Sequence, residues 1–340
     1  MQANKGMSKP MSGKLLSILK TRELPVSIAL VTLVLVTYLL NPLFLTAQSV
    51  KDLLLNSTII VILAAGQALV IITRNVDLSV GAILGLSGFL TGTLFATVPG
   101  IPIPLVFVAG MALGALLGAI NGMLVTVAGV PALVITLGTL YIFRGINNFW
   151  AGGKEYFSGD RPEAFGNLSV DTFLGIPIIT LLGIAVVATL ALILSKTRPG
   201  RDLYAIGSDP EAARLLGIRT GNRVFVAFIV NGFLAGLVGV IYASRFSSVG
   251  ATTGTGMELD VVAAVVVGGV AIFGGSGTVV GAAIGAVLLT TITSSLTATG
   301  VDKFWQQAVV GILILSAIVI DRVGSLRRSK KLAIEGANVE

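Results

Sequence analysis

The residue types that the chain lacks set the first limit on the chemistry it could perform. Its 340 residues include no histidine and no cysteine. Disulfides, thiolate nucleophiles, zinc sites of the usual composition and histidine proton relays are therefore excluded. The carboxylates form no nucleophile–base–orienter set, and no Gly-x-x-x-x-Gly-Lys-Ser/Thr motif occurs. We expect a chain that is not an enzyme, that binds no metal or cofactor of its own, and that leaves nucleotide hydrolysis to another protein.

A few uncharged polar side chains lie inside long apolar runs and are candidates to line a solute path. They are Gln67, Asn121, Thr136 and Asn231, joined by a hydroxyl cluster at 290–295. Amides and hydroxyls without a deeply buried fixed charge suit a neutral polar solute better than an ion. Each residue alone is more often used for an interhelical hydrogen bond. Arg144 is a charged residue inside an apolar run. It lies near the outer end of that run, and its side chain is expected to extend to the membrane interface.

A first polar break separates two apolar runs at 73–81. It contains Arg74, Asp77, Ser79 and Gly81. Because charges at this depth are costly unless paired or solvated, we expect Asp77 to cap the following helix. Arg74 would then pair with Asp77 or with the end of the preceding helix. The interpretation is a turn that fixes two helices, and a contribution to a translocation gate is the alternative.

A second break, at 273–278, is rich in glycine. Gly274, Gly275 and Gly277 fall within it, but no lysine follows as in a phosphate-binding loop. Backbone without regular structure would leave amides unpaired if it faced lipid. We therefore expect this break to connect two helices or to line a cavity, and we group it with the first break as a candidate gate.

The polar stretch 196–223 contains residues that are typical of a short helix with a cap at each end. Asp209 can cap it, Pro210 suits its first position, Glu211 complements its positive end, and Gly217 can close it about two turns later. Such a helix on a basic loop is suited to dock on a soluble partner. The residues assigned to it are Gly207, Asp209, Pro210, Glu211, Ala212, Ala213, Arg214, Leu215, Leu216 and Gly217.

The elements that hold these residues are predicted to be membrane-spanning helices. A hydrophobic fraction of 54%, a charged fraction of 11% and 42 glycines are typical of an all-α, polytopic membrane protein. Runs of bilayer length predict about ten spans, of which the fifth and eighth are short and are expected either to be half-helices or to extend into neighbouring segments. The spans are 25–43, 54–73, 81–98, 101–126, 131–146, 177–195, 224–244, 261–273, 278–297 and 304–320.

The distribution of charge predicts the orientation of these spans. With ten spans, both tails and the stretch 196–223 share one side, which has a large excess of Lys and Arg, whereas the other side is acidic. The positive-inside rule makes the basic side cytoplasmic. We expect a cytoplasmic tail at 1–24, a transmembrane domain at 25–322 in a bacterial inner membrane, and a cytoplasmic tail at 323–340. The net charge of +7 then requires no nucleic-acid partner.

Glycines at four-residue spacing mark three helix faces. They occur at 110–122, at 232–236 and at 281–285. Such faces allow two helix backbones to approach closely. Packing within one subunit is the interpretation, and a subunit interface or a solute path is the alternative.

Four motifs in order resemble the permease subunits of bacterial ABC sugar importers, in the branch for ribose, xylose, rhamnose and autoinducer 2. They are 74–81 (RNVDLSVG), 130–140 (VPALVITLGTL), 205–218 (AIGSDPEAARLLGI) and 267–277 (VGGVAIFGGSG). The resemblance implies that 207–218 is the coupling helix, which enters a groove on the ATPase subunit. The common family form has glycine where Arg74 and Asn75 stand, which puts a flexible gate at that turn in question.

The resemblance also implies the partners and the solute. An ABC ATPase would bind ATP and Mg, a periplasmic sugar-binding protein would deliver the solute, and a second permease subunit, identical or paralogous, would complete the path in the bilayer. The solute would be a monosaccharide or a similar small neutral polyol. Two alternatives stay open: an ion-coupled secondary transporter, disfavoured because no acidic residue is expected well inside a span, and an ABC permease for branched-chain amino acids.

Overall fold

The chain folds almost entirely into helices. The structure, a computed structural model, describes residues 23–302, 304–309, 311–312, 315–316 and 319. Its helices are α2 (Glu23–Leu40), η1 (Pro42–Leu45), α3 (Ala47–Ile72), α4 (Val80–Thr97), α5 (Ile103–Ala128), α6 (Ala132–Ala151), η2 (Ser158–Asp160), α7 (Glu163–Asn167), α8 (Ile178–Lys196), α9 (Arg198–Ser208), α10 (Pro210–Leu215), α11 (Thr220–Arg245), α12 (Met257–Val267) and α13 (Val279–Ala298). The all-α fold class is confirmed.

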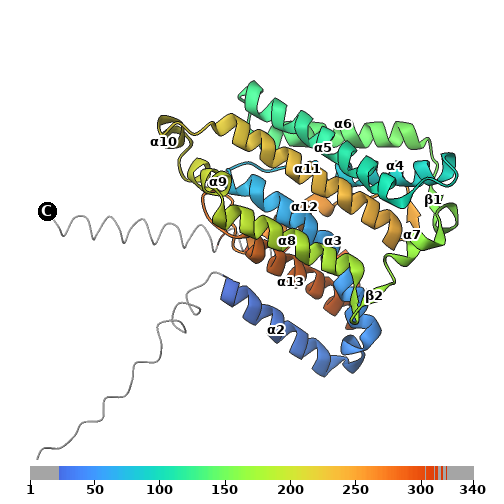
Figure 1. Cartoon of the computed structure of the whole chain (residues 1–340). Coiled ribbons are helices and arrows are strands. Elements are labelled where there is room, and N and C mark those ends of the chain that lie inside the picture. Colours follow the sequence, from blue (N-terminus) through green and yellow to red (C-terminus); the bar gives the residue numbers. More distant parts are fainter. Residues whose placement is uncertain (1–22, 303, 310, 313–314, 317–318, 320–340) are drawn as a thin grey trace, which may run out of the picture.

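Four strands of two residues each complete the described elements. β1 (Tyr156–Phe157) pairs antiparallel with β4 (Ser248–Val249), and β2 (Thr172–Phe173) pairs antiparallel with β3 (Ile176–Pro177). These short ribbons lie in the segments between helices. With α7, they form the end of the molecule that is opposite α9 and α10 (Figure 1).

Seven helices in the described part of the chain are long and apolar enough to cross a membrane: α2, α3, α4, α5, α8, α11 and α13. Nine of the ten predicted spans coincide with a described helix, since α6 and α12 occupy the fifth and eighth. The tenth, 304–320, lies partly outside the described residues, and the tails 1–24 and 323–340 lie almost wholly outside them. The total of ten therefore stays a prediction.

The two short spans turn out differently from each other. α12 has 11 residues, which span about 16 Å, roughly half of a bilayer core, so the half-helix prediction is confirmed there. α6 has 20 residues and continues to Ala151, so the fifth span is not a half-helix but extends into the neighbouring segment, the other of the two expected outcomes. Its last turns contain Arg144 and Asn147, which bond across the bundle to the backbone at Thr253 and Ala251. These bonds allow the helix to continue past the end of its apolar run.

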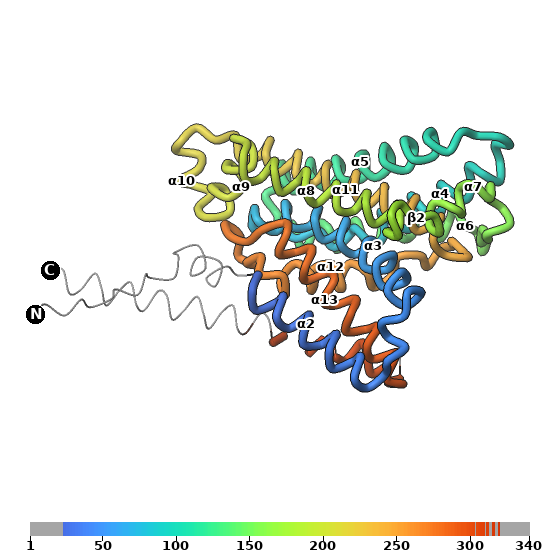
Figure 2. The backbone as a smooth tube through the Cα atoms, turned by 60° about the horizontal axis from the view of Figure 1, so that its bottom comes forward, coloured from blue at the N-terminus to red at the C-terminus, as the bar shows by residue number. Residues whose placement is uncertain are grey.

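The centre of the bundle is α3, which packs against α8, α11, α12 and α13. Eighty-three per cent of its most apolar stretch is buried, against 6% for α2. α2 lies on the outside against α13 (Figure 2). α2 therefore presents most of its apolar surface outward, as expected for a helix that faces lipid.

The glycine faces bring α5 and α11 into backbone contact. A Cβ atom on Gly114 would overlap the carbonyl oxygen of Gly232, and one on Gly236 would overlap that of Gly110. On the third face, a Cβ on Gly285 would overlap the carbonyl oxygen of Ala264 in α12. All three faces pack against helices of the same chain, which confirms packing within one subunit.

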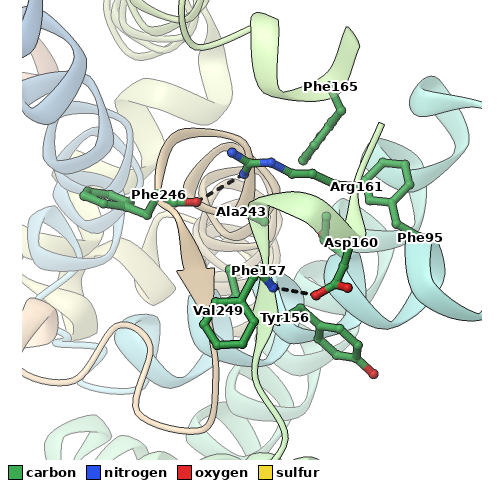
Figure 3. Close-up of a pocket in the computed structure, with 11 residues that line it drawn as sticks. Phe95, Tyr156, Phe157, Asp160, Arg161, Phe165, Ala243, Phe246 and Val249 are labelled. Atoms are coloured by element: carbon green, nitrogen blue, oxygen red, sulfur yellow. Dashed lines mark hydrogen bonds between the residues drawn. The ribbon is translucent and has the colours of Figure 1, made fainter. Parts of the chain in front are cut away.

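One hollow at the α7 end is filled by aromatic side chains. Phe95 and Phe165 lie with ring centroids 4.7 Å apart, and Arg161 donates to the Phe246 carbonyl at 3.2 Å (Figure 3). Burial lowers the pKa of the Arg161 guanidinium. The remaining space is only about 10 Å³, so this hollow does not hold a solute.

Candidate functional site

The short helix predicted in 196–223 is present, with the expected cap. Asp209 Oδ1 accepts from the backbone N–H of Glu211 at 2.9 Å and of Ala212 at 3.0 Å, and helix α10 begins at Pro210. Gly217 has a φ of 79°, a left-handed conformation that glycine adopts without strain. The local sequence alone therefore specifies this helix.

The rest of that stretch is not the loop that we expected. Helix α9 occupies residues 198–208, with Thr197 as its N-cap and buried Leu203 and Ile206 on one face. A capping threonine, a proline at the second helical position and two apolar residues three apart were the available signal. The stretch is thus a helical pair, α9–α10, at one end of the molecule (Figure 1).

Helix α10 projects an apolar tip into the surroundings. Leu215 is 90% exposed and Leu216 is 80% exposed, and Glu211, Ala212 and Arg214 are also on the surface. Two of the assigned docking residues, Gly207 and Ala213, are instead buried and anchor the pair to the bundle. Beside α10 lies a hollow of about 320 Å³ lined by Arg198, Asp202, Gly217, Ile218, Arg219, Asn222 and Arg223.

The end of α9 is joined to both breaks. The Gly275 N–H donates to the Ile72 carbonyl at 2.9 Å, and a Cβ on Gly207 would overlap that same carbonyl oxygen. Tyr204 donates its hydroxyl to the Gly277 carbonyl at 2.8 Å, and burial raises the pKa of the phenol, which keeps it a donor. The two breaks, 200 residues apart in sequence, therefore meet under the helical pair.

Arg74 makes a different pairing from the expected one. Its Nε donates to the Gly207 carbonyl at 2.6 Å, and its guanidinium also donates to the Ser208 carbonyl. The backbone N–H of Arg74 donates to the Ile71 carbonyl at the end of α3, at 2.9 Å, but the guanidinium pairs with α9, so the expected side-chain pairing with Asp77 or with the end of α3 is wrong. Arg74 has a φ of 65°, a strained left-handed value for a side chain with a Cβ. A cation at the C-terminal end of α9 satisfies carbonyls that a helix end leaves unpaired.

The first measurable consequence concerns Arg74. We expect Arg74→Ala to lower the free energy of unfolding by about 1–3 kcal/mol, because two carbonyl groups lose their donor. Arg74→Gly should lose about 1 kcal/mol less, since glycine tolerates the left-handed backbone. Thermal unfolding of the detergent-solubilised protein measures both. Arg201→Ala, on the exposed surface of α9, is the control and should leave stability unchanged. Equal losses for Arg74→Ala and Arg74→Gly would contradict the assignment of strain.

Asp77 does not cap α4 as expected, because the N-cap of that helix is Ser79 and no side-chain cap bond is made there. It is fully buried, and its Oδ1 accepts from both the N–H and the hydroxyl of Ser79, at 2.9 and 2.7 Å. Its Oδ2 accepts from the Asn231 amide at 3.0 Å. Ser79, the residue that precedes α4, makes no side-chain cap of its own. Asp77 thus lies in the break between α3 and α4 and not inside a span, yet its carboxyl group is deeply buried.

The four candidates for a solute path gather around this carboxylate. The Asn231 amide also donates to Gln67 Oε1 at 3.2 Å, and Asn121 donates to the Ser79 hydroxyl at 2.7 Å. Thr136 donates to the Val76 carbonyl and accepts from the N–H of Leu78, each at 3.1 Å. All four side chains are fully buried. They form a closed amide cluster that ties α3, α5, α6 and α11 to the first break, so a solute could pass along them only if these helices separated.

Gly81 at the start of α4 and Arg144 in α6 both contact α12 or the segment that precedes it. A Cβ on Gly81 would overlap Glu258 Oε2, so this glycine allows close approach of the segment before and within α12. Arg144 lies 3.6 Å from Glu258 and donates to Thr255 Oγ1 at 2.6 Å. The Arg144 side chain is thus bonded to α12 and to the segment before it.

Comparison with known proteins gives a consistent group of matches. Residues 49–318 match the family model described as "Branched-chain amino acid transport system / permease component". Proteins named "Autoinducer 2 import system permease protein LsrC" are similar over nearly the whole chain. The one from Enterobacter sp. (strain 638) is 38% identical over 92% of this chain and 90% of its own. Those from Escherichia coli (strain K12 / DH10B) and Salmonella typhi are 39% and 37% identical, each over 91% of this chain and 89% and 88% of their own. No solved structure matches the chain.

Proposed function

The chain belongs to the family of branched-chain amino acid transport system permease components, and on that premise we propose that it is the membrane-spanning permease subunit of an ATP-driven importer of a monosaccharide or similar small neutral polyol. The relatives' description as autoinducer 2 import permeases supports this class of solute. The single observation that carries the mechanism is the contact of the α9–α10 pair with both breaks at once.

The exposed tip of α10 is suited to dock on an ABC ATPase, which would bind ATP and Mg. Leu215 and Leu216 supply apolar surface, and Glu211 and Arg214 supply charge on the same helix. Large exposed apolar side chains rimmed by polar ones are typical of protein–protein contacts. Asp209, Pro210 and Gly217 then fix the shape of the tip, and they need not touch the partner.

Movement of the docked tip of α10 would directly displace helices of the bundle. Gly207 lies against Ile72 and Gly275 with no side chain between them, so α9 cannot shift without displacing the ends of α3 and of the second break. Arg74 adds two hydrogen bonds to the same joint. In this role the residues of both breaks, Arg74, Asp77, Ser79, Gly81, Gly274, Gly275 and Gly277, transmit the motion that opens and closes the path.

The remaining partners follow from the orientation. The protein would lie in a bacterial inner membrane with both termini and the α9–α10 pair in the cytoplasm, as the basic charge of that side favours. The opposite end, with α7 and the short strands, would face a periplasmic sugar-binding protein. A second permease subunit, identical or paralogous, would complete the path, and no nucleic acid is involved.

The test uses proteoliposomes containing the permease, its ATPase and its binding protein. Replacing both leucines of the tip (Leu215→Asp with Leu216→Asp) should lower ATP-dependent uptake about tenfold and release the ATPase from the purified complex, because charges replace the apolar contact. Thermal stability should not change, since both side chains are exposed. Leu174→Asp, equally exposed at the other end, is the control and should retain the ATPase.

Three outcomes would contradict the proposal. Uptake without any ATPase would favour an ion-coupled transporter. Retention of the ATPase by the doubly substituted protein would refute docking at α10. Uptake of L-leucine in place of autoinducer 2 or a pentose would favour a branched-chain amino acid permease, as the family description states for that family.

A further inference from the structure

A polar groove lies between α3, α13 and η1, outside the closed amide cluster. Its volume is about 490 Å³, within the range of about 300–1,000 Å³ that holds small-molecule ligands. It lies near the start of α3, at the end away from the α9–α10 pair, which contacts α3 at Ile72. We name it the α3–α13 groove. Its lining residues are Asn41, Leu43, Phe44, Ser49, Asp52, Leu53, Asn56, Thr293, Ser294, Thr297, Ala298 and Gln306.

The groove offers hydrogen-bond acceptors that nothing in the described chain uses. Asn56 Oδ1 is buried and has no hydrogen-bond partner. Thr293 donates its hydroxyl proton to the Thr290 carbonyl of its own helix at 3.0 Å, so its oxygen is left as an acceptor. Ser294 lies beside it and adds a hydroxyl that can donate or accept. A buried acceptor without a donor is costly, and a turn of the Asn56 amide toward the groove would let a ligand hydroxyl supply that donor.

The charges around the groove favour a neutral ligand. Asp52 pairs with Arg245 at 2.7 Å, which offsets its charge. The described lining residues include no Lys or Arg. A zwitterionic amino acid would bring a carboxylate to this site without a cation to pair with it. A polyol brings several hydroxyl donors and no charge, which matches the unpaired acceptors.

We propose that the α3–α13 groove is a polyol-binding site on the solute path, with Asn56, Thr293 and Ser294 as the residues that contact the solute. This proposal rests on the proposed function and specifies where in the chain the solute is bound. It replaces the four amides and hydroxyls of the closed amide cluster as the contacting set. Because the groove is at the end opposite α10, it would receive the solute before the helices rearrange.

The first experiment removes the acceptors while keeping side-chain volume. In the reconstituted importer, Asn56→Leu combined with Thr293→Val should lower ATP-dependent uptake of autoinducer 2 or D-ribose about tenfold, while the ATPase stays bound and still hydrolyses ATP. Thr189→Val is the matched control, because Thr189 makes the same kind of backbone bond, to the Ala185 carbonyl at 2.8 Å, on α8 and away from the groove. Uptake at the wild-type level in the double variant would overturn the proposal.

The second experiment does not depend on the folding of that double variant. Because the chain has no cysteine, Ser294→Cys gives a single reactive thiol in the groove. A mixture of D-ribose, D-xylose, L-rhamnose and glycerol should slow its modification by a methanethiosulfonate reagent several-fold, and L-leucine should not. Thr189→Cys should show no protection. Equal modification rates with and without the polyols would overturn the groove assignment, whereas absence of ATP-dependent uptake by the wild-type importer would instead overturn the proposed function.

Discussion

Asn231→Asp is expected to destroy the folded bundle, and adding Asp77→Asn to it is expected to restore the bundle. In the wild-type protein the Asn231 amide donates to Asp77 Oδ2 at 3.0 Å. A carboxylate in its place would set two acidic groups against each other in a fully buried cluster. One of them would have to be protonated or remain unpaired, so we expect a loss of about 3–5 kcal/mol.

The exchange of the two side chains should rescue stability because every donor regains an acceptor. The asparagine at 77 would accept from the N–H and hydroxyl of Ser79 with its carbonyl oxygen and donate its amide to the new carboxylate at 231. Gln67 has a buried Nε2 without a partner, and a flip of its amide would bring that group to the same carboxylate. The double variant should recover at least about 3 kcal/mol of the loss, a coupling that independent sites do not show.

Asp77→Asn alone provides the matched control for this exchange. Asn231 Oδ1 is also buried without a partner, so a flip of the Asn231 amide would let this oxygen accept from the new amide at 77, and a flip of the Gln67 amide would let its Nε2 donate to the same oxygen. We therefore expect Asp77→Asn to remain close to wild type, whereas Asp77→Leu should lose several kcal/mol because three donors lose their acceptor. The measurements are yield after solubilisation and thermal unfolding. If the exchange variant were no more stable than Asn231→Asp, the hydrogen-bond assignment would be wrong.

Gly114→Leu is the second substitution with a large expected effect. The backbones of α5 and α11 touch at this position: a Cβ on Gly114 would overlap the Gly232 carbonyl oxygen and lie 2.7 Å from Gly236 Cα. Backbone atoms cannot move aside as a side chain can, so the two helices must separate along their whole contact. We expect a loss of about 3 kcal/mol or more, at the upper end for overpacking.

Gly138→Ala is the control for a glycine in an equally helical setting. No atom lies within 4 Å of the position that its Cβ would take. Alanine is the better helix former by about 1 kcal/mol, so this variant should be at least as stable as wild type. Thermal unfolding of both variants in detergent measures the contrast. Similar stabilities for Gly114→Leu and Gly138→Ala would show that α5 and α11 are not in contact.

Some helices and caps could be predicted from neighbouring residues in the sequence, and others could not. Asp209, Pro210 and Gly217 specified α10 because a cap needs only its own neighbours along the chain. Helix α9 was missed because its composition is polar and its buried face consists of few residues. The end of α6 was misplaced because its last turns are held by bonds to residues more than one hundred positions away.

The residues of the candidate site, like the helices, could be predicted from the sequence only in part. Gln67, Asn121, Thr136 and Asn231 were identified as the polar residues of the spans, and the breaks were found as interruptions of apolar runs. The hydrogen-bond partners of these residues could not be predicted, because the partners are far apart in sequence. Asn231 bonds Asp77 across 154 residues, and Arg74 bonds Gly207 across 133. The α3–α13 groove was also missed, although the hydroxyl cluster of α13 was noted, because Asn56 supplies its key acceptor from another helix.

The amino-acid sequence by itself determined the class of this protein: a helical membrane permease with a short capped helix and with glycine faces that pack helices together. Composition, apolar run length and capping depend on neighbouring residues, so they can be read without a structure. Only the tertiary structure decided which polar residues are closed inside the bundle, which line a groove, and how α9 is joined to both breaks. Those properties depend on which distant segments come into contact, because burial and hydrogen-bond partners are set by packing in three dimensions.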